Sequence, residues 1–174
     1  MSIENDVTFG TAGGRDLELD IYRPPSDIPR RSAVIQLHGG AFRVGSRAMM
    51  TPRAEALSAL GYVCLPADYR LLHEAPWPAQ LHDVKAAIRW TRENADQLGI
   101  EADRIVTQGN GAGGHLAMTS GINGSPDWEG DSGSPDASDA CPALVQTRSQ
   151  KRSHHLRIEL CSGIADRFFS RCGK

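Results

Sequence analysis

The sequence predicts an α/β fold in which a mainly parallel sheet is flanked by helices. Three apolar runs, at residues 33–37, 62–65 and 105–106, are separated by segments whose apolar side chains recur at helical spacing. Nearly continuous apolar runs are typical of strands covered on both faces. Their alternation with helices is typical of parallel strands joined by right-handed crossovers.

An antiparallel hairpin is expected ahead of the first parallel strand. The segments Val7–Phe9 and Leu17–Ile21 alternate apolar and polar residues, as half-buried strands do. Two glycines at 13 and 14 supply a turn between them, and two prolines at 24 and 25 end the second strand. Proline ends it because it cannot donate a hydrogen bond to a neighbouring strand.

Three helices are expected between and after the parallel strands. The first begins with Thr51 as its N-cap and ends at Gly61. The second spans Trp77–Leu98, where apolar residues recur at steps of three, four or seven, and Gly99 caps its C-terminus. The third follows the strand at 105–106 and continues through Met118.

Composition and charge indicate an ordinary globular protein, with 40% hydrophobic residues and a net charge of −2 at pH 7. A charge this close to neutral gives no reason to expect nucleic acid or an acidic surface as a partner. The polar N-terminus and the shortness of the apolar runs predict no secretory signal and no membrane segment, so we expect a cytoplasmic protein. The four cysteines are expected as free thiols, because their spacings fit no zinc pattern and the cytoplasm is reducing.

The most informative motif is Gly109–Gly114 (GNGAGG), which lies between an apolar strand and a helix. This is the layout of the nucleophile elbow G-x-S-x-G, with Gly111 in the place of the serine. The same residues match the dinucleotide fingerprint G-x-G-x-x-G. That fingerprint requires an acidic residue about 20 positions later at the end of a second strand, whereas Asp131 lies in a Gly/Ser/Pro-rich segment. A third interpretation is a glycine-rich turn without a ligand.

Two further motifs stand at matching spacing before the elbow, His38–Phe42 (HGGAF) and Asp68–Arg70 (DYR). Together with the elbow they resemble the hormone-sensitive-lipase-like branch of the α/β-hydrolases, in particular bacterial short-chain and feruloyl-type carboxylesterases. The likeness runs from about Val7 to Asp139. It implies a partial α/β-hydrolase fold and hydrolysis of small-molecule carboxylic esters through an acyl-serine intermediate, with no metal and no cofactor.

The resemblance also implies roles for single residues. The backbone N–H groups of Gly40, Ala41 and Ala112 would form the oxyanion hole, which stabilises the charge that develops on an ester carbonyl. His38 and Gly39 would support that loop, and Asp68–Arg70 would be its scaffold. The alternative for the first motif is a plain turn at the end of a strand.

For this chain, however, the catalytic groups are expected to be missing. Gly111 has no side chain that could act as the nucleophile. In the family the acid and the histidine follow on later loops, which we expect beyond residue 174, and His154 and His155 are expected to be solvated. His115 is expected to pack structurally. We therefore expect an inert or nearly inert relative, or alternatively a non-catalytic binding module that keeps the pocket. The sequence does not indicate the oligomeric state.

The sequence changes character near residue 140. Residues 1–140 hold 12 Lys and Arg against 19 Asp and Glu, whereas residues 141–174 hold 7 against 2. Periodicity is already lost after Gly121, apart from a candidate strand at Leu156–Leu160. We therefore divide the chain into the N-terminal part of an α/β-hydrolase domain, 1–140, and a tail, 141–174. The tail is expected to be weakly ordered or aberrant, either divergent or translated out of frame.

Overall fold

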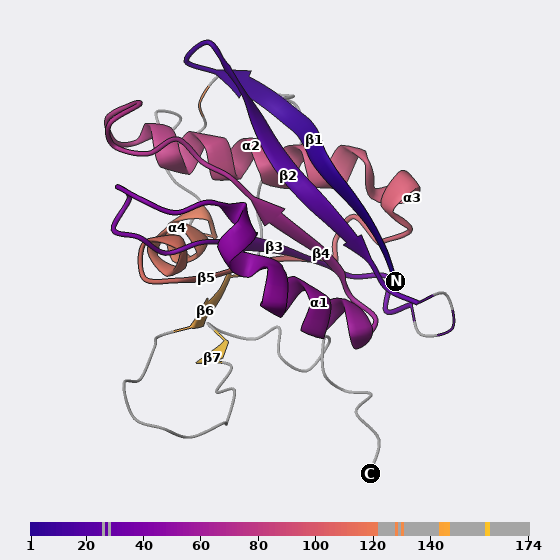
Figure 1. Cartoon of the computed structure of the whole chain (residues 1–174). Coiled ribbons are helices and arrows are strands. Elements are labelled where there is room, and N and C mark those ends of the chain that lie inside the picture. The colour runs from indigo at the N-terminus through magenta and orange to yellow at the C-terminus, as the bar shows by residue number, and fades with distance from the viewer. Residues whose placement is uncertain are drawn as a thin grey trace.

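In the computed structural model, the described residues are 1–25, 27, 29–121, 128, 130, 143–146 and 159–160. Within them seven strands form one sheet in the order β1-β2-β4-β3-β5-β6-β7 (Figure 1). The strands are β1 (Ser2–Ala12), β2 (Arg15–Arg23), β3 (Ala33–Leu37), β4 (Val63–Ala67), β5 (Ile105–Asn110), β6 (Ala143–Gln146) and β7 (Glu159–Leu160). The helices are η1 (Arg47–Met50), α1 (Thr51–Ala59), α2 (Ala79–Glu93), α3 (Ala95–Leu98) and α4 (Ala112–Ser120).

The predicted hairpin and parallel sheet are confirmed. Strands β1 and β2 pair antiparallel, and β2 pairs antiparallel with β4. Strands β4, β3, β5 and β6 are parallel to their neighbours in the sheet. The turn between β1 and β2 uses Gly13 and Gly14, whose φ angles are 62° and 79°. Glycine adopts positive φ without the steric cost that a side chain would add.

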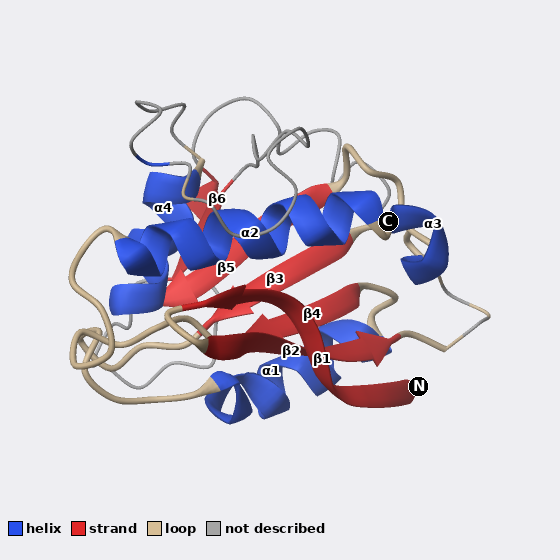
Figure 2. Ribbon diagram, turned by 90° about the horizontal axis from the view of Figure 1, so that it is seen from above, coloured by secondary structure: helices blue, strands red, loops and turns tan. Residues whose placement is uncertain are grey.

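Helices cover both faces of the sheet, with α1 on one side and α2, α3 and α4 on the other (Figure 2). Alternate residues of β3 belong to different clusters because successive side chains of a strand point to opposite faces. Ala33, Ile35 and Leu37 join the large core that includes α2 and α4 residues. Val34 joins the smaller core that includes Ala54 of α1. This is why the parallel strands are apolar at nearly every position.

Two details of the predicted helices are wrong. Met50, not Thr51, occupies the N-cap position of α1, because η1 already brings the chain into a helical conformation there. Thr51 is thus the first residue of α1, and its hydroxyl lies 3.3 Å from the Tyr22 hydroxyl. The segment predicted as one helix from Trp77 to Leu98 is two helices, α2 and α3, with Asn94 between them. The predicted cap at Gly99 is confirmed, with φ of 68°.

Strand β6 was not expected. The family likeness was predicted to stop at about Asp139. Ala143–Gln146 nevertheless forms a strand that pairs in parallel with β5. A strand of four residues is too short for an alternation of apolar and polar residues to be recognised in the sequence. It forms because its backbone hydrogen-bonds to the edge of β5. Strand β7 lies inside the predicted strand 156–160. The rest of the predicted tail, with His154 and His155, lies outside the described residues, and the boundary at residue 140 stays a prediction.

Arg47 connects the hairpin to the body of the fold. Its guanidinium is ion-paired with Asp6 of β1, with Glu18 and Asp20 of β2, and with Asp68 after β4. Nε lies 3.0 Å from Asp20 Oδ1, and the Arg47 backbone N–H donates to Asp68 Oδ1 at 2.7 Å. Burial lowers the pKa of the guanidinium, but the hydrogen bonds and charges of Asp20 and Asp68 outweigh it, so the pKa is raised.

In the described part of the chain, no helix has both the length and the apolar character needed to cross a membrane. The cytoplasmic location stays a prediction.

Candidate active site

The elbow is formed where β5 ends at Asn110 and α4 begins at Ala112. Gly111 lies between them with φ of 55° and ψ of −119°. Non-glycine residues rarely adopt such a conformation, and at a functional site it costs them on the order of 1–3 kcal/mol. A Cβ built on Gly111 would have no atom of the described residues within 4 Å, so the position is open toward this part of the chain. The strand-turn-helix arrangement predicted for the motif is therefore present, with room for a side chain at Gly111.

Glycine is needed at positions 109 and 113, on either side of Gly111, because the backbones pack closely there. A Cβ on Gly109 would lie 2.3 Å from the carbonyl carbon of Gly113. A Cβ on Gly113 would lie 2.2 Å from the carbonyl oxygen of Leu37. Only glycine permits α4 to approach β5 and β3 this closely. The packing of the first turn of α4 thus explains the outer glycines of the motif, whereas it does not require a glycine at 111.

The loop after β3, residues 38–46, forms the other side of the site. Three successive residues have positive φ, namely Gly40 at 126°, Ala41 at 52° and Phe42 at 61°. The N–H groups of Arg43 and Val44 donate to the Gly40 carbonyl at 3.0 and 3.2 Å, which turns the loop back on itself. Successive residues with such angles can direct backbone N–H groups to one side, where they attract an anion.

The two loops lie side by side because their strands are neighbours. Leu37 at the end of β3 is in register with Gly109 of β5. A Cβ on Gly39 would lie 3.0 Å from the Asn110 carbonyl oxygen, so the loop passes close to the elbow. Among the described residues, none accepts a hydrogen bond from the N–H groups of the predicted donors Gly40, Ala41 and Ala112. This arrangement supports the predicted oxyanion hole.

His38 supports this loop from within the core. Its imidazole is buried and stacks on Tyr69, with ring centroids 4.3 Å apart. The Tyr69 hydroxyl donates to the His38 carbonyl at 2.8 Å, and His38 Nδ1 lies 2.7 Å from the Gly39 carbonyl oxygen. Burial lowers the pKa of His38 and raises that of Tyr69. Burial thus favours the neutral form of the imidazole, and the position of His38 agrees with its predicted support of the loop.

Each residue of the segment Asp68–Arg70 contacts another part of the fold. Asp68 binds Arg47 at the end of the loop, and Tyr69 stacks on His38. The Arg70 guanidinium binds Asp83 of α2, with Nη2 2.7 Å from Oδ1, and the Arg70 backbone N–H donates to Asp83 Oδ2 at 2.8 Å. The motif thus connects the loop after β3 to the hairpin side and to α2.

Sequence reasoning missed an aromatic cluster at the site. His115 of α4 packs edge-on against Phe42 at a centroid distance of 5.9 Å and against Trp77 at 5.7 Å. Phe42 and Trp77 are 6.3 Å apart. His115 is exposed, and 44% of the surface of Trp77 is exposed. The three residues are far apart in the sequence, so only the order of the strands could have indicated their contact.

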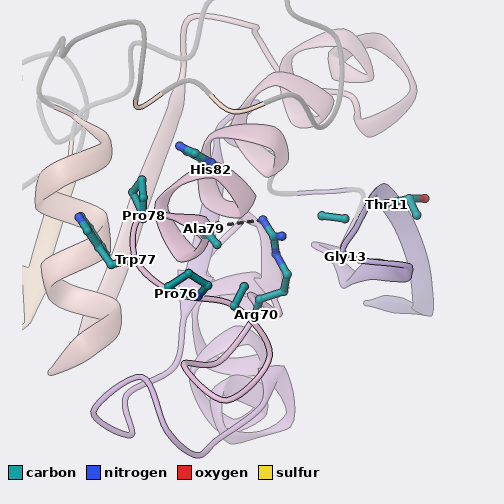
Figure 3. Close-up of a pocket in the computed structure, with 10 residues that line it drawn as sticks. Thr11, Gly13, Arg70, Pro76, Trp77, Pro78, Ala79 and His82 are labelled. Atoms are coloured by element: carbon teal, nitrogen blue, oxygen red, sulfur yellow. Dashed lines mark hydrogen bonds between the residues drawn. The ribbon is translucent and has the colours of Figure 1, made fainter.

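A pocket of about 460 Å³ lies on the other side of Trp77. It is lined by the turn of the hairpin (Thr11–Gly13), by Arg70, by residues 75–79 and by His82 (Figure 3). Arg70 Nη2 donates to the Ala79 carbonyl at 3.3 Å on its wall. Of the residues with predicted roles, the pocket is lined by Arg70 of the scaffold segment, and not by Gly111 or the predicted oxyanion-hole residues. Among the described side chains, no group of three or more His, Cys, Asp or Glu could hold a metal ion.

Comparison with known proteins matches residues 19–147 to the family model BD-FAE. The chain is 38% identical to the esterase LipQ of Mycobacterium tuberculosis over 68% of this chain and 29% of LipQ. It is 34% identical to the ethyl acetate hydrolase of Pseudomonas putida over 65% of this chain and 36% of that enzyme. The chain thus spans about a third of the length of these curated relatives.

Solved structures agree with this match. Thermogutta terrifontis esterase 2 superposes with a TM-score of 0.70 and 33% identity, covering 78% of this chain and 52% of that enzyme. Its propionate-bound form superposes with a TM-score of 0.68 and 33% identity, covering 78% and 51%. The family match continues past Asp139 to residue 147 and therefore includes β6.

Proposed function

Because the chain belongs to the BD-FAE family of α/β-hydrolase carboxylesterases, we propose that it carries an esterase site that no longer turns over esters. The family reaction is hydrolysis of a small carboxylic ester through an acyl-serine intermediate. The observation that carries the proposal is glycine at position 111, in an elbow whose backbone is otherwise formed.

The step that Gly111 cannot perform is the nucleophilic attack on the ester. A serine would contribute the oxygen that attacks the ester carbonyl, and glycine has no atom to replace it. In a serine protease, removal of the nucleophile lowers turnover by about six orders of magnitude. Ester hydrolysis at this elbow should therefore be close to the rate in buffer.

A second function, non-catalytic binding of small carboxylic esters or acids, is favoured by the preserved loops. The N–H groups of Gly40, Ala41 and Ala112 come from two loops that approach each other closely, and donors of this kind stabilise negative charge on a carbonyl or carboxylate oxygen. The related Thermogutta esterase 2 has been solved with propionate bound. Binding needs these donors but not the nucleophile.

The first test is hydrolysis of p-nitrophenyl acetate and butyrate. We expect no release of p-nitrophenol above the buffer control, and no labelling by a fluorophosphonate probe. Turnover that the probe abolishes would contradict the proposal and would mean that another residue serves as the nucleophile.

The second test is a titration with propionate, followed by backbone amide NMR shifts. Shifts should concentrate in residues 39–42 and 111–113. Ala112→Pro removes one donor at the first residue of a helix, where proline is well tolerated, and should weaken binding. The absence of saturable shifts in the unchanged chain would exclude the binding function, provided that the chain is folded.

A further inference from the structure

The contacts of His115 place its ring beside the elbow. The residue stands four positions after Gly111, and its backbone N–H donates to the Gly111 carbonyl at 3.0 Å. Residues four apart share one face of a helix, and helical side chains lean toward the N-terminus. The ring therefore lies over the first turn of α4. Its edge-on contact with Phe42, next to Ala41, brings it to the loop that carries the other predicted donors.

Two aromatic neighbours contact the ring, and no polar group of the described residues does. Phe42 and Trp77 contact it at interplanar angles of 89° and 71°. No hydrogen bond or ion pair joins the His115 side chain to another residue in the described part of the chain. His38 differs, since it is buried and its Nδ1 is engaged by its own loop. His115 is thus an oriented imidazole whose nitrogens are open to a ligand.

The space at Gly111 is open toward the described residues. None of their atoms would lie within 4 Å of a Cβ built on Gly111. A carboxylate has two oxygens, so one can accept from the backbone donors while the other occupies this space. An imidazole N–H is a suitable donor to that second oxygen, because a hydrogen bond to an ionised acceptor is about twice as strong as one between neutral groups.

We propose that His115 binds a small carboxylate at the elbow by donating a hydrogen bond to one of its oxygens. The other oxygen accepts from the N–H groups of Gly40, Ala41 and Ala112. This inference rests on the proposed binding function and specifies its ligand as the acid and not the ester. The ester lacks the second charged oxygen, so His115 gains no comparable bond from it.

Two substitutions separate binding from packing. His115→Phe keeps a ring between Phe42 and Trp77 but removes both nitrogens. His115→Gln removes the ring but keeps a donor. The probe is propionate, titrated into the full chain and followed by NMR, with propionamide as the neutral control. Thermal unfolding of each variant shows whether it remains folded.

We expect His115→Phe to weaken propionate binding about ten- to a hundredfold, since a hydrogen bond to a charged group is lost. Its affinity for propionamide should change less than about threefold. His115→Gln should recover part of the propionate affinity. A ring that only packs would give the opposite order, with Phe close to the natural residue and Gln weaker. That order would overturn the inference.

The same titrations distinguish the inference from the proposed function. If the unchanged chain does not bind propionate, the binding function fails. If the unchanged chain and His115→Phe bind it equally, the site binds acids and only the role of His115 fails.

Discussion

Glycine at position 111 removes a side chain from the elbow while the backbone around it is retained. The elbow conformation has a positive φ, which glycine adopts more easily than serine. Glycine therefore occupies this turn with less backbone strain than serine would. The same substitution leaves the backbone donors of the neighbouring loop in place, so binding and catalysis can be tested separately.

Restoring the serine should restore little activity. We expect Gly111→Ser to hydrolyse p-nitrophenyl butyrate at least about 10⁴-fold more slowly than an active carboxylesterase of the family. A serine needs a general base, and that base needs an acid to orient it. His115 lies near the elbow, but no carboxylate contacts its side chain in the described part of the chain. Steady-state kinetics and active-site titration with a fluorophosphonate would measure the effect.

Normal turnover by this variant would contradict the expectation. A base would then lie within reach of the new hydroxyl. His115→Phe in the same background would test the nearest candidate, and His154 and His155 would follow.

At the scale of elements, the site depends on how closely α4 approaches the ends of β3 and β5. Both strands are parallel and in register from Ala33↔Ile105 to Leu37↔Gly109, so their following loops leave the sheet at the same edge. Ligands of α/β sheets bind at this carboxyl edge. The outer glycines of the elbow set the distance between helix and strands.

Gly113→Ala should therefore destabilise the fold strongly. Its Cβ would meet the backbone carbonyls of Leu37 and His38 at 2.2 and 2.5 Å, and backbone atoms cannot rotate away. We expect the free energy of unfolding to fall by about 3 kcal/mol or more, at the upper end of overpacking costs. Urea denaturation would measure it.

Gly99→Ala is the matched control. Gly99 differs from Gly113 in having a positive φ, at 68°, and a Cβ there would have no atom of the described residues within 4 Å. It should cost only about 1–2 kcal/mol for the left-handed conformation. Equal losses for the two variants would mean that α4 can shift away from β3, and that the close approach is not required.

At the scale of the molecule, Arg47 joins parts of the chain that are far apart in the sequence. Its partners come from β1, β2 and the segment after β4, while Arg47 itself follows the loop of the candidate site. Asp20 and Asp68 matter most, because their side chains are only 11% and 15% exposed. Asp6 is largely exposed and contributes little.

Arg47→Met should destabilise the whole fold by about 3 kcal/mol, since it leaves the largely buried carboxylates of Asp20 and Asp68 without this cation. Arg31→Met is the control, because its pair with Glu101 spans 3.6 Å and the Arg31 side chain is 63% exposed, so the loss should stay below about 1 kcal/mol. Denaturation of both variants would measure the difference. Equal effects would contradict a connecting role for Arg47.

Features that depend on neighbouring residues could be predicted from the sequence, whereas features that depend on distant partners could not. The hairpin, the parallel strands, the elbow and the cap at Gly99 follow from patterns within about ten residues, and the structure has all of them. The start of α1 was misplaced because η1, which no sequence pattern indicated, precedes it. Strand β6 was missed because its evidence is a partner, β5, more than thirty residues earlier.

The sequence by itself determined the fold class, the family resemblance and the glycine at the central position of the elbow motif, because periodicity, glycine spacing and residue identity are local properties. Only the tertiary structure decided which side chains meet at the site. Phe42, Trp77 and His115 come together because β3, β4 and β5 end at one edge of a sheet and their following segments converge there. No local pattern encodes such a contact, since it depends on the order of strands that are distant in the chain.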